Sequence, residues 1–263
     1  MHIVVTVKPV VDPNTPPALF RIGNDGTTLE LGAGISQIMN GCDANAVEAA
    51  LALKEMHGGS ITVLSVGGEP SKSCLRRAIG MGADRGVQIE GPGGLACDSA
   101  LIAKLLGKAI RKLGPVNLIL CGRQASDTDA GQVPLLLAEE LKIAAASPIQ
   151  RIHAVDEQAI VVDRIGDDCT QRLRVQFPAV LGISNELNKP RPAPLKGVML
   201  AKKAEIPCWS QRDLGVEDLK PGLMLRRLFI EQPANKRAEF IVAESEQAAG
   251  SALADRLRME GMI

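Results

Sequence analysis

The chain reads LILCGRQASDTDAGQV from Leu118 to Val133. The apolar residues at its start predict a buried β-strand over Val116–Cys121, and the polar, glycine-bearing residues after them predict a loop. The apolar spacing over Val133–Leu141 then predicts a helix that begins near Gln132. A strand, a glycine loop and a helix in this order are typical of the carboxyl edge of an open parallel sheet. Free N–H groups and the helix dipole attract an anionic nucleotide at that edge.

The segments before this run alternate between strand and helix patterns. The apolar runs predict strands over Ile3–Val7, Ser60–Val66 and Gly86–Ile89, and the helical spacing predicts helices over Ala44–Met56, Ser71–Met81 and Ser99–Leu113. We expect Asp43 and Asp98 to cap the first and third of these helices. This alternation predicts an α/β fold, in which a doubly wound, mostly parallel sheet has helices on both faces.

The pattern changes after Pro148. Strands are predicted over Ile149–Val155, Ala159–Ile165 and Arg172–Phe177, and a hairpin turn at 166–168 joins the second to the third. We expect these strands to form a small antiparallel extension, after which Ala179–Ile183 returns to the main sheet.

The last part of the chain has a weaker pattern. A proline-punctuated segment leads to a predicted helix over Leu195–Lys203, and the residues beyond it contain a strand-like run at Leu223–Ile230 and a final helix near Ser245–Met259. We expect an α/β domain over residues 1–206 and a C-terminal arm over residues 207–263 that packs on a partner.

The composition excludes several classes of protein. Basic and acidic residues balance at 30 each, and the chain has four phenylalanines, one tryptophan and no tyrosine, so nucleic-acid binding is not expected. No apolar run reaches the roughly 20 residues of a membrane helix. The start of the chain lacks the layout of a signal peptide, so we expect a cytoplasmic protein without membrane insertion. No Cys-x-x-Cys pair occurs among Cys42, Cys74, Cys97, Cys121, Cys169 and Cys208, and no metal site is expected.

Two other loops are expected beside the Gly122–Gly131 loop. Lys8 follows the first strand, where it either meets a phosphate or is a solvated lysine at a strand end. Asn40 begins the run Asn-Gly-Cys-Asp, where it either reaches a base or ribose or is a turn residue.

The loop itself holds Arg123 as a cation against two aspartates, Asp127 and Asp129. A phosphate would therefore rest on backbone N–H groups, and an aspartate would be free to accept hydrogen bonds from ribose hydroxyls. Asp129 is also predicted to cap the helix in a capping box with Gln132. No P-loop, Gly-x-Gly-x-x-Gly, Gly-x-Ser-x-Gly or His-Glu-x-x-His motif is present. These absences predict a nucleotide that is bound without being transformed, and no residue is assigned a catalytic role.

Several segments together resemble the beta subunit of electron transfer flavoproteins. The resemblance covers about residues 1–206 in register, without a large gap. The segments that carry it are Gly122–Gln132, Val7–Val10, Ala46–Glu55, Ala78–Arg85, Phe177–Val180, Leu187–Arg191 and Ala201–Lys203.

The resemblance implies a heterodimer on a scaffold like that of the adenine-nucleotide alpha hydrolases. The alpha subunit holds most contacts to a redox FAD, and the beta subunit binds AMP or, in electron-bifurcating types, a second FAD. The implied nucleotide site consists of Thr6, Lys8, Asn40, Gly41, Cys42, Asp43, Val63 or its neighbours, Cys121, Gly122, Arg123, Gln124, Ala125, Ser126, Asp127, Thr128, Asp129, Ala130, Gly131, Gln132 and Val133.

The resemblance also implies a partner-recognition segment over residues 187–203. Its docking residues are Pro194, Leu195, Lys196 and Met199, with Leu195 as the apolar anchor for acyl-CoA dehydrogenases. Leu200 replaces a lysine that is usual there, which leaves the dehydrogenase partner open.

Departures from the family pattern favour FAD over AMP in this subunit, with AMP as the alternative. Val133 after Gln132 and the tail that opens at Trp209 are closer to the bifurcating subgroup, and the small residues Gly41 and Cys42 leave room for an isoalloxazine ring. Ser126 stands where isoleucine is usual. A bifurcating site also needs NADH, and no NAD fingerprint is present, so backbone and polar groups, partly from the alpha subunit, would supply those contacts.

Two other classes of protein remain as alternatives. One is a nucleotide hydrolase or ATP-binding sensor on the same scaffold, which would turn nucleotide over or be stable alone. The other is a scaffold subunit with a vestigial nucleotide site.

Overall fold

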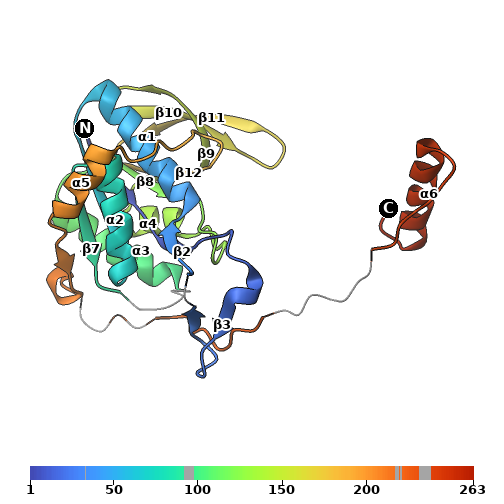
Figure 1. Ribbon diagram of the computed structural model, residues 1–263. Helices are drawn as coiled ribbons and strands as arrows, with labels where there is room; N and C mark the ends of the chain where they lie inside the picture. Colours follow the sequence, from blue (N-terminus) through green and yellow to red (C-terminus); the bar gives the residue numbers. More distant parts are fainter. Residues whose placement is uncertain (33, 92–97, 217–218, 220, 231–237) are drawn as a thin grey trace. The chain divides into compact units, whose positions relative to one another are not determined.

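Parallel strands form the centre of the main sheet in the computed structural model, which describes all residues except 33, 92–97, 217–218, 220 and 231–237 (Figure 1). In spatial order they are β12 (Ala179–Ile183), β8 (Leu118–Gly122), β1 (His2–Thr6), β6 (Ser60–Val66) and β7 (Arg85–Ile89). The register pairs Val5 of β1 with Leu120 of β8 and Val63 of β6. All five carboxyl ends therefore lie at one edge of the sheet, as the sequence predicts.

Helices cover both faces of this sheet. α1 (Gly41–His57) and α2 (Glu69–Met81) contribute to the apolar core on one face, and α3 (Ser99–Leu113) and α4 (Val133–Leu141) contribute to the core on the other. β8 and β12 are buried along their whole length. Their continuous apolar runs are what a parallel strand needs when helices cover both of its faces. The predicted doubly wound α/β fold is confirmed.

An antiparallel extension continues the sheet beyond β12. It consists of β9 (Ala144–Val155), β10 (Ala159–Ile165) and β11 (Thr170–Gln176). The predicted start of β9 at Ile149 is wrong, because the strand already begins at Ala144. Its alanine-rich first half pairs in parallel with β12 and its second half pairs with β10. Alanine has low β-propensity, so tertiary pairing rather than local preference forms this first half.

The predicted strands coincide with β6, β10 and β12, and they differ by one or two residues at the ends of β1, β7, β8 and β11. Two helices begin earlier than predicted. α2 begins at Glu69 rather than Ser71, with Pro70 in its first turn. α1 begins at Gly41, with Asn40 rather than Asp43 at the N-cap position. Asp43 lies inside the first turn, where its carboxylate is buried. The predicted cap of α3 is confirmed, since the Asp98 carboxylate accepts hydrogen bonds from Ala100 and Leu101 N–H.

Several short elements were not predicted, because each is only two or three residues long. Between β1 and α1 the chain forms antiparallel pairs of β2 (Pro9–Val11) with β5 (Gln37–Met39) and of β3 (Phe20–Ile22) with β4 (Leu29–Leu31). The short helix η1 (Pro17–Leu19) precedes β3, β13 (Cys208–Trp209) extends the sheet beside β7, and η2 (Arg212–Leu214) follows it.

The chain divides into two units, Met1–Phe229 and Ile230–Ile263. The first contains α5 (Leu195–Lys203), which begins and ends as predicted. The predicted strand at Leu223–Ile230 is wrong, since these residues form no regular element. The second unit contains α6 (Glu246–Met259), which Ser245 caps by accepting a hydrogen bond from Ala248 N–H, and no α6 residue is buried.

None of the helices in the described parts of the chain has the length and apolar character needed to cross a membrane. Cys42, Cys74, Cys121, Cys169 and Cys208 are free thiols, and Cys97 lies outside the described residues.

Candidate functional site

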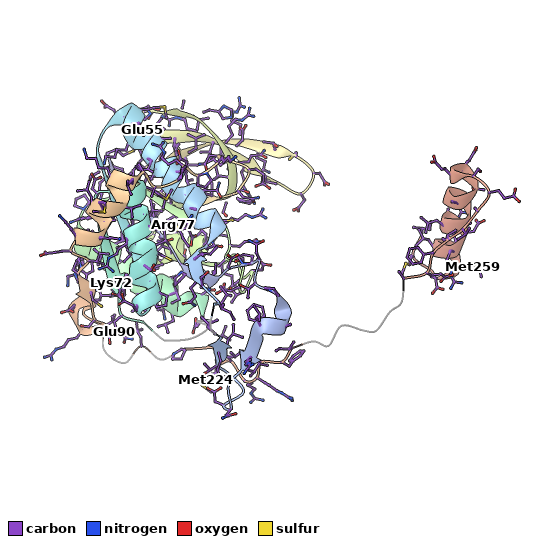
Figure 2. The ribbon with its side chains drawn as sticks, viewed as in Figure 1. Glu55, Lys72, Arg77, Glu90, Met224 and Met259 are labelled. Atoms are coloured by element: carbon purple, nitrogen blue, oxygen red, sulfur yellow. The ribbon has the colours of Figure 1, made fainter. Side chains whose placement is uncertain are left out.

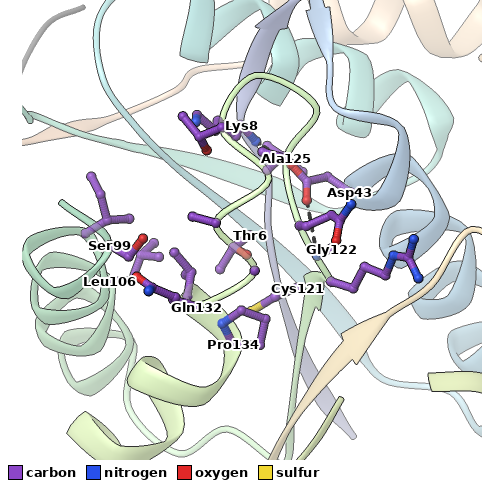
Figure 3. A pocket seen from close by; sticks show the side chains of 18 of the residues that line it. Thr6, Lys8, Asp43, Ser99, Leu106, Cys121, Gly122, Ala125, Gln132 and Pro134 are labelled. Carbon is purple, nitrogen blue, oxygen red and sulfur yellow. Dashed lines mark hydrogen bonds between the residues drawn. The ribbon is translucent and has the colours of Figure 1, made fainter. Parts of the chain in front are cut away.

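A pocket opens at the carboxyl edge of the main sheet, where β1, β6 and β8 end (Figure 3). We call it the edge pocket. It encloses an empty volume of about 790 Å³, part of which is open to solvent. Its lining residues are Thr6, Val7, Lys8, Asp43, Val66, Ser99, Ile102, Leu106, Cys121, Gly122, Arg123, Gln124, Ala125, Thr128, Ala130, Gly131, Gln132, Val133 and Pro134. The structure therefore brings together most of the site that the sequence implied.

Asn40 fixes the Gly122–Gly131 loop rather than lining the edge pocket. This side chain is buried, with 2% of its area exposed. Its Nδ2 donates to the carbonyl of Gln124 at 2.8 Å, and its Oδ1 accepts from Ser126 N–H at 3.3 Å. A buried carboxamide bonded on both sides holds a loop firmly, because breaking either bond leaves a buried polar group without a partner.

Asp43 joins two strand ends. One carboxylate oxygen accepts from Lys8 N–H at 2.7 Å, after β1, and the other accepts from Gly122 N–H at 3.1 Å, at the end of β8. Burial raises the pKa of Asp43 to about 7, although both backbone donors act in the opposite direction. A Cβ on residue 122 would lie 2.2 Å from the Asp43 carboxylate, so only glycine fits there.

The predicted capping box at Asp129 is wrong. Gln132 occupies the N-cap position of α4 without a side-chain cap, and the Asp129 carboxylate accepts instead from Gln124 Nε2 at 3.0 Å. Asp129 and Gly131 have φ values of 48° and 62°. The left-handed backbone of Asp129 is uncommon for a residue other than glycine. Because no side chain caps α4, the N–H groups of Val133 and Leu135 are available to an anion, whereas Pro134 between them has no N–H.

Two cationic side chains line the edge pocket. Lys8 Nζ lies 2.7 Å from Asp127 Oδ2, which is part of the loop but not of the lining. Arg123 Nε is buried and has no hydrogen-bond partner among the described residues. A buried donor without a partner in the protein is costly and would gain from a bound acceptor.

Apolar residues form the opposite wall. Val66 ends β6, and Ile102 and Leu106 share one side of α3 with Ser99 at the start of that helix. The sequence interpretation missed this wall. The spacing of 99, 102 and 106 was a helical signal, but nothing local distinguished a stripe that faces a pocket from one that faces the core.

Other implied residues lie outside the lining. Val63 is fully buried in the core, three residues before Val66 on β6. Gly41, Cys42, Ser126, Asp127 and Asp129 also lie outside it. Burial raises the pKa of the Cys121 thiol to about 12, so this lining thiol stays protonated near neutral pH. No group of side chains able to hold a metal ion occurs among the described residues.

Comparison with known proteins places the chain in a family. A family model described as the electron transfer flavoprotein domain matches residues 32–214, which is more than half of the chain. The chain belongs to the electron transfer flavoprotein family.

Relatives that match over nearly the whole chain support this assignment. The electron transfer flavoprotein subunit beta of Thermoanaerobacterium thermosaccharolyticum is 32% identical, with both chains fully covered. Protein FixA of Azorhizobium caulinodans is 32% identical over 96% of this chain and 92% of its own. The caffeyl-CoA reductase-Etf complex subunit CarD of Acetobacterium woodii is 30% identical, again with both chains fully covered.

This electron transfer flavoprotein chain presents a second exposed feature at α5. Leu195 and Met199 have 80% and 53% of their area exposed, and Val198 and Leu200 are also exposed. Pro194 occupies the N-cap position without a side-chain cap, and Lys196 follows Leu195. The helix itself lies close to α2, since a Cβ on Gly197 would lie 2.1 Å from the carbonyl oxygen of Gly80.

Side chains of α1 hold the segment that leads into α5. Asn45 Nδ2 donates to the carbonyl of Asn188 at 2.7 Å, and Asn188 Nδ2 donates back to the carbonyl of Asn45 at 3.0 Å. The Arg191 guanidinium lies 2.8 Å from Glu48 and also contacts Glu55, which Figure 2 labels on α1. The pKa of Glu48 is lowered by its hydrogen bonds to Arg191, against the effect of its burial.

Proposed function

We propose that this chain is the beta subunit of a heterodimeric electron transfer flavoprotein and that the edge pocket holds an adenine nucleotide. The observation that carries the proposal is the coincidence of two facts. The chain aligns end to end with a named beta subunit, and the loop that resembles the family signature forms one wall of a pocket. The pocket lies at the carboxyl edge of a parallel sheet, where α/β proteins bind nucleotides.

The chemistry of the pocket fits such a ligand. Lys8, Arg123 and the uncapped start of α4 offer positive charge and N–H donors for phosphate. Val66, Ile102 and Leu106 offer an apolar surface for a base. The carboxamides of Gln124 and Gln132 line the same pocket and offer polar groups to ribose hydroxyls, with Gln124 Nε2 already bonded to Asp129. The buried Asp43 carboxylate is already bonded to two backbone N–H groups, so the proposed role of the pocket is to hold the nucleotide rather than to cleave it.

The ligand that we propose is FAD, with AMP as the alternative. A second hollow adjoins the edge pocket and shares Ser99, Gly131 and Gln132 with it. Leucine side chains dominate the rest of its wall, at positions 101, 135, 136, 219 and 223. A ligand longer than AMP has an apolar surface onto which to extend there. FAD supplies one- and two-electron transfer, and the protein supplies position, hydrogen bonds and dielectric.

The exposed surface of α5 supports a proposal about the electron-transfer partner. Leu195 and Met199 are exposed apolar side chains on a helix that packs closely against α2 through Gly197. We propose that it docks an acyl-CoA dehydrogenase or a related flavoenzyme. The C-terminal residues 207–263 are proposed to pack on the alpha subunit, with NADH as the electron donor if the edge pocket holds FAD.

One experiment tests these assignments together. The chain is co-expressed with its alpha subunit, the cofactors are released by denaturation, and FAD and AMP are counted per heterodimer. Two FAD and no AMP support a second flavin in this subunit, and NADH oxidation is then measured. One FAD and one AMP support the alternative. A heterodimer without any nucleotide in this chain, or steady hydrolysis of ATP or AMP, contradicts the proposal.

A further inference from the structure

One ion pair joins a lining residue of the edge pocket to the Gly122–Gly131 loop. Lys8 Nζ lies 2.7 Å from Asp127 Oδ2 and 2.8 Å from Asp127 Oδ1. Lys8 is one of the residues that line the pocket, whereas Asp127 is not. The two side chains have exposed fractions of 33% and 16%, so water screens this pair only in part.

The backbone on both sides of the pair is held by other contacts. Lys8 N–H donates to the buried Asp43 carboxylate, and Ser126 N–H, next to Asp127, donates to the buried Asn40 side chain. The Lys8 ammonium can therefore leave Asp127 by rotating its own flexible stem, without moving the strand end or the loop. Asp127 would keep a weaker contact at 3.4 Å from the Thr128 hydroxyl.

The ion pair reduces the positive charge that the pocket offers to a ligand. Its lining cations are Lys8 and Arg123, and Lys8 is neutralised by Asp127. The phosphate monoester of AMP carries roughly −1.5 to −2 charge near neutral pH, and each phosphate of the FAD diphosphate carries a single negative charge, so either ligand competes with the Asp127 carboxylate for the same ammonium. A ligand without phosphate leaves the pair intact and gains nothing from Lys8.

We propose that Lys8 and Asp127 form a phosphate-selective clasp: Asp127 holds the Lys8 ammonium in the empty pocket and yields it to the phosphate of a bound nucleotide. This inference rests on the proposed nucleotide function and adds the residues that distinguish a nucleotide from a nucleoside. Asp127 then lowers phosphate affinity, because each binding event must break its ion pair with Lys8.

The test compares AMP with adenosine by calorimetric titration of the full chain, freed of nucleotide, at low salt. Asp127→Asn keeps the shape of the side chain and removes its charge. It is expected to tighten AMP binding about twofold to fivefold, which is what a partly exposed ion pair is worth. Lys8→Met removes the ammonium and is expected to weaken AMP binding about tenfold or more. Adenosine affinity stays unchanged in both variants.

The double variant and a remote pair complete the design. In the Lys8→Met background, Asp127→Asn is expected to tighten AMP binding less than it does alone, because the two residues act on one another. Glu139→Gln and Lys142→Met alter a more exposed ion pair at the far end of α4 and are expected to leave both affinities unchanged. Thermal unfolding of each variant confirms that it is folded.

The outcomes separate the clasp from the nucleotide function. Weaker AMP binding by Asp127→Asn overturns the clasp, because Asp127 would then hold Lys8 toward the phosphate. An unchanged AMP affinity in either single variant also overturns it, while adenosine binding in all variants still supports the nucleotide pocket. If the wild-type chain binds neither AMP nor adenosine, the clasp and the nucleotide function fall together.

Discussion

Helix α1 holds two surface segments, and it holds them by different means. Its N-terminal end fixes the Gly122–Gly131 loop through Asn40 and Asp43, whose side chains are 2% and 6% exposed and bond mainly to backbone groups. Its later turns fix the segment before α5 through Glu48 and Glu55, which form ion pairs with a partly exposed Arg191. The pocket loop thus depends on buried groups that have no alternative partner, whereas water can replace the ion-pair partners of the segment before α5.

This difference predicts how mutation, salt and pH affect the stability of each segment. Buried hydrogen bonds are costly to lose and insensitive to salt, and a buried carboxylate makes stability depend on pH. Partly exposed ion pairs contribute less and are screened by salt. The following predictions begin with the largest expected effect.

Gly122→Ala tests the closest contact at the pocket. The added Cβ would lie 2.2 Å from the Asp43 carboxylate and 2.9 Å from its backbone nitrogen, and neither can withdraw without moving α1. We expect a loss of about 3 kcal/mol in the free energy of unfolding, measured with urea. Gly41→Ala is the control, since a Cβ there meets nothing within 4 Å. Its stability is expected to be unchanged or higher by up to about 1 kcal/mol. Equal effects of the two variants would contradict the close packing at Gly122.

Stability should depend on pH through Asp43. Burial raises its pKa from 3.8 in the unfolded chain to about 7 in the folded protein. Between these values the folded state binds more protons than the unfolded state, so the contribution of Asp43 to stability falls as the pH rises through this window. The slope is at most about 1.4 kcal/mol per pH unit, and the contribution is lost above the folded pKa. The measurement is the difference in unfolding free energy between wild type and Asp43→Asn from pH 4.5 to 8. A pH-independent difference would show that the folded pKa is not raised.

Arg191→Met tests the ion pairs that hold the segment before α5. We expect a loss of about 1 kcal/mol in the free energy of unfolding, because the ion pairs are partly exposed and the methionine retains the apolar stem. Amide hydrogen exchange over residues 188–203 should become faster, while exchange in the Gly122–Gly131 loop stays unchanged. In wild type, 1 M salt should reproduce part of the effect. Faster exchange in both segments would mean that α1 couples them.

Leu195→Ser is expected to have the smallest effect on the fold, within about 0.5 kcal/mol, since 80% of Leu195 is exposed. Its effect should appear in docking. We expect binding to a partner acyl-CoA dehydrogenase to weaken by about 1 to 3 kcal/mol, measured by titration. Leu19→Ser, at another exposed leucine that is 48% exposed, is the control and should leave docking unchanged. Equal docking by wild type and Leu195→Ser would remove Leu195 as the anchor.

Much of the fold follows from local patterns. The apolar runs of β6, β10 and β12 coincide with the predicted strands, and α5 coincides with its predicted helix. Each has strong periodicity or clear punctuation by glycine and proline. The misses have local explanations. The first half of β9 is rich in alanine, and the apolar residues of Leu223–Ile230 have strand propensity but pair with no strand among the described residues.

The site was predictable only in part. The sequence brought Thr6, Lys8 and the Gly122–Val133 loop to one edge, because parallel strands share the direction of their carboxyl ends. It assigned wrong partners to Asp43 and Asp129. Both were interpreted as helix caps, since Asp before an apolar helix usually is one. Asp43 bonds instead to residues that are 35 and 79 positions away, and Asp129 bonds to Gln124.

Local sequence therefore determined most of the elements, their order and the edge of the sheet at which the edge pocket lies, because backbone preference and hydrophobic period act over a few residues. The tertiary structure decided which buried polar groups meet. Asn40 with the loop, Asp43 with two strand ends and Arg191 with α1 are pairings of distant residues. A buried donor or acceptor takes whichever partner the packed fold brings within reach, and no local pattern specifies that partner.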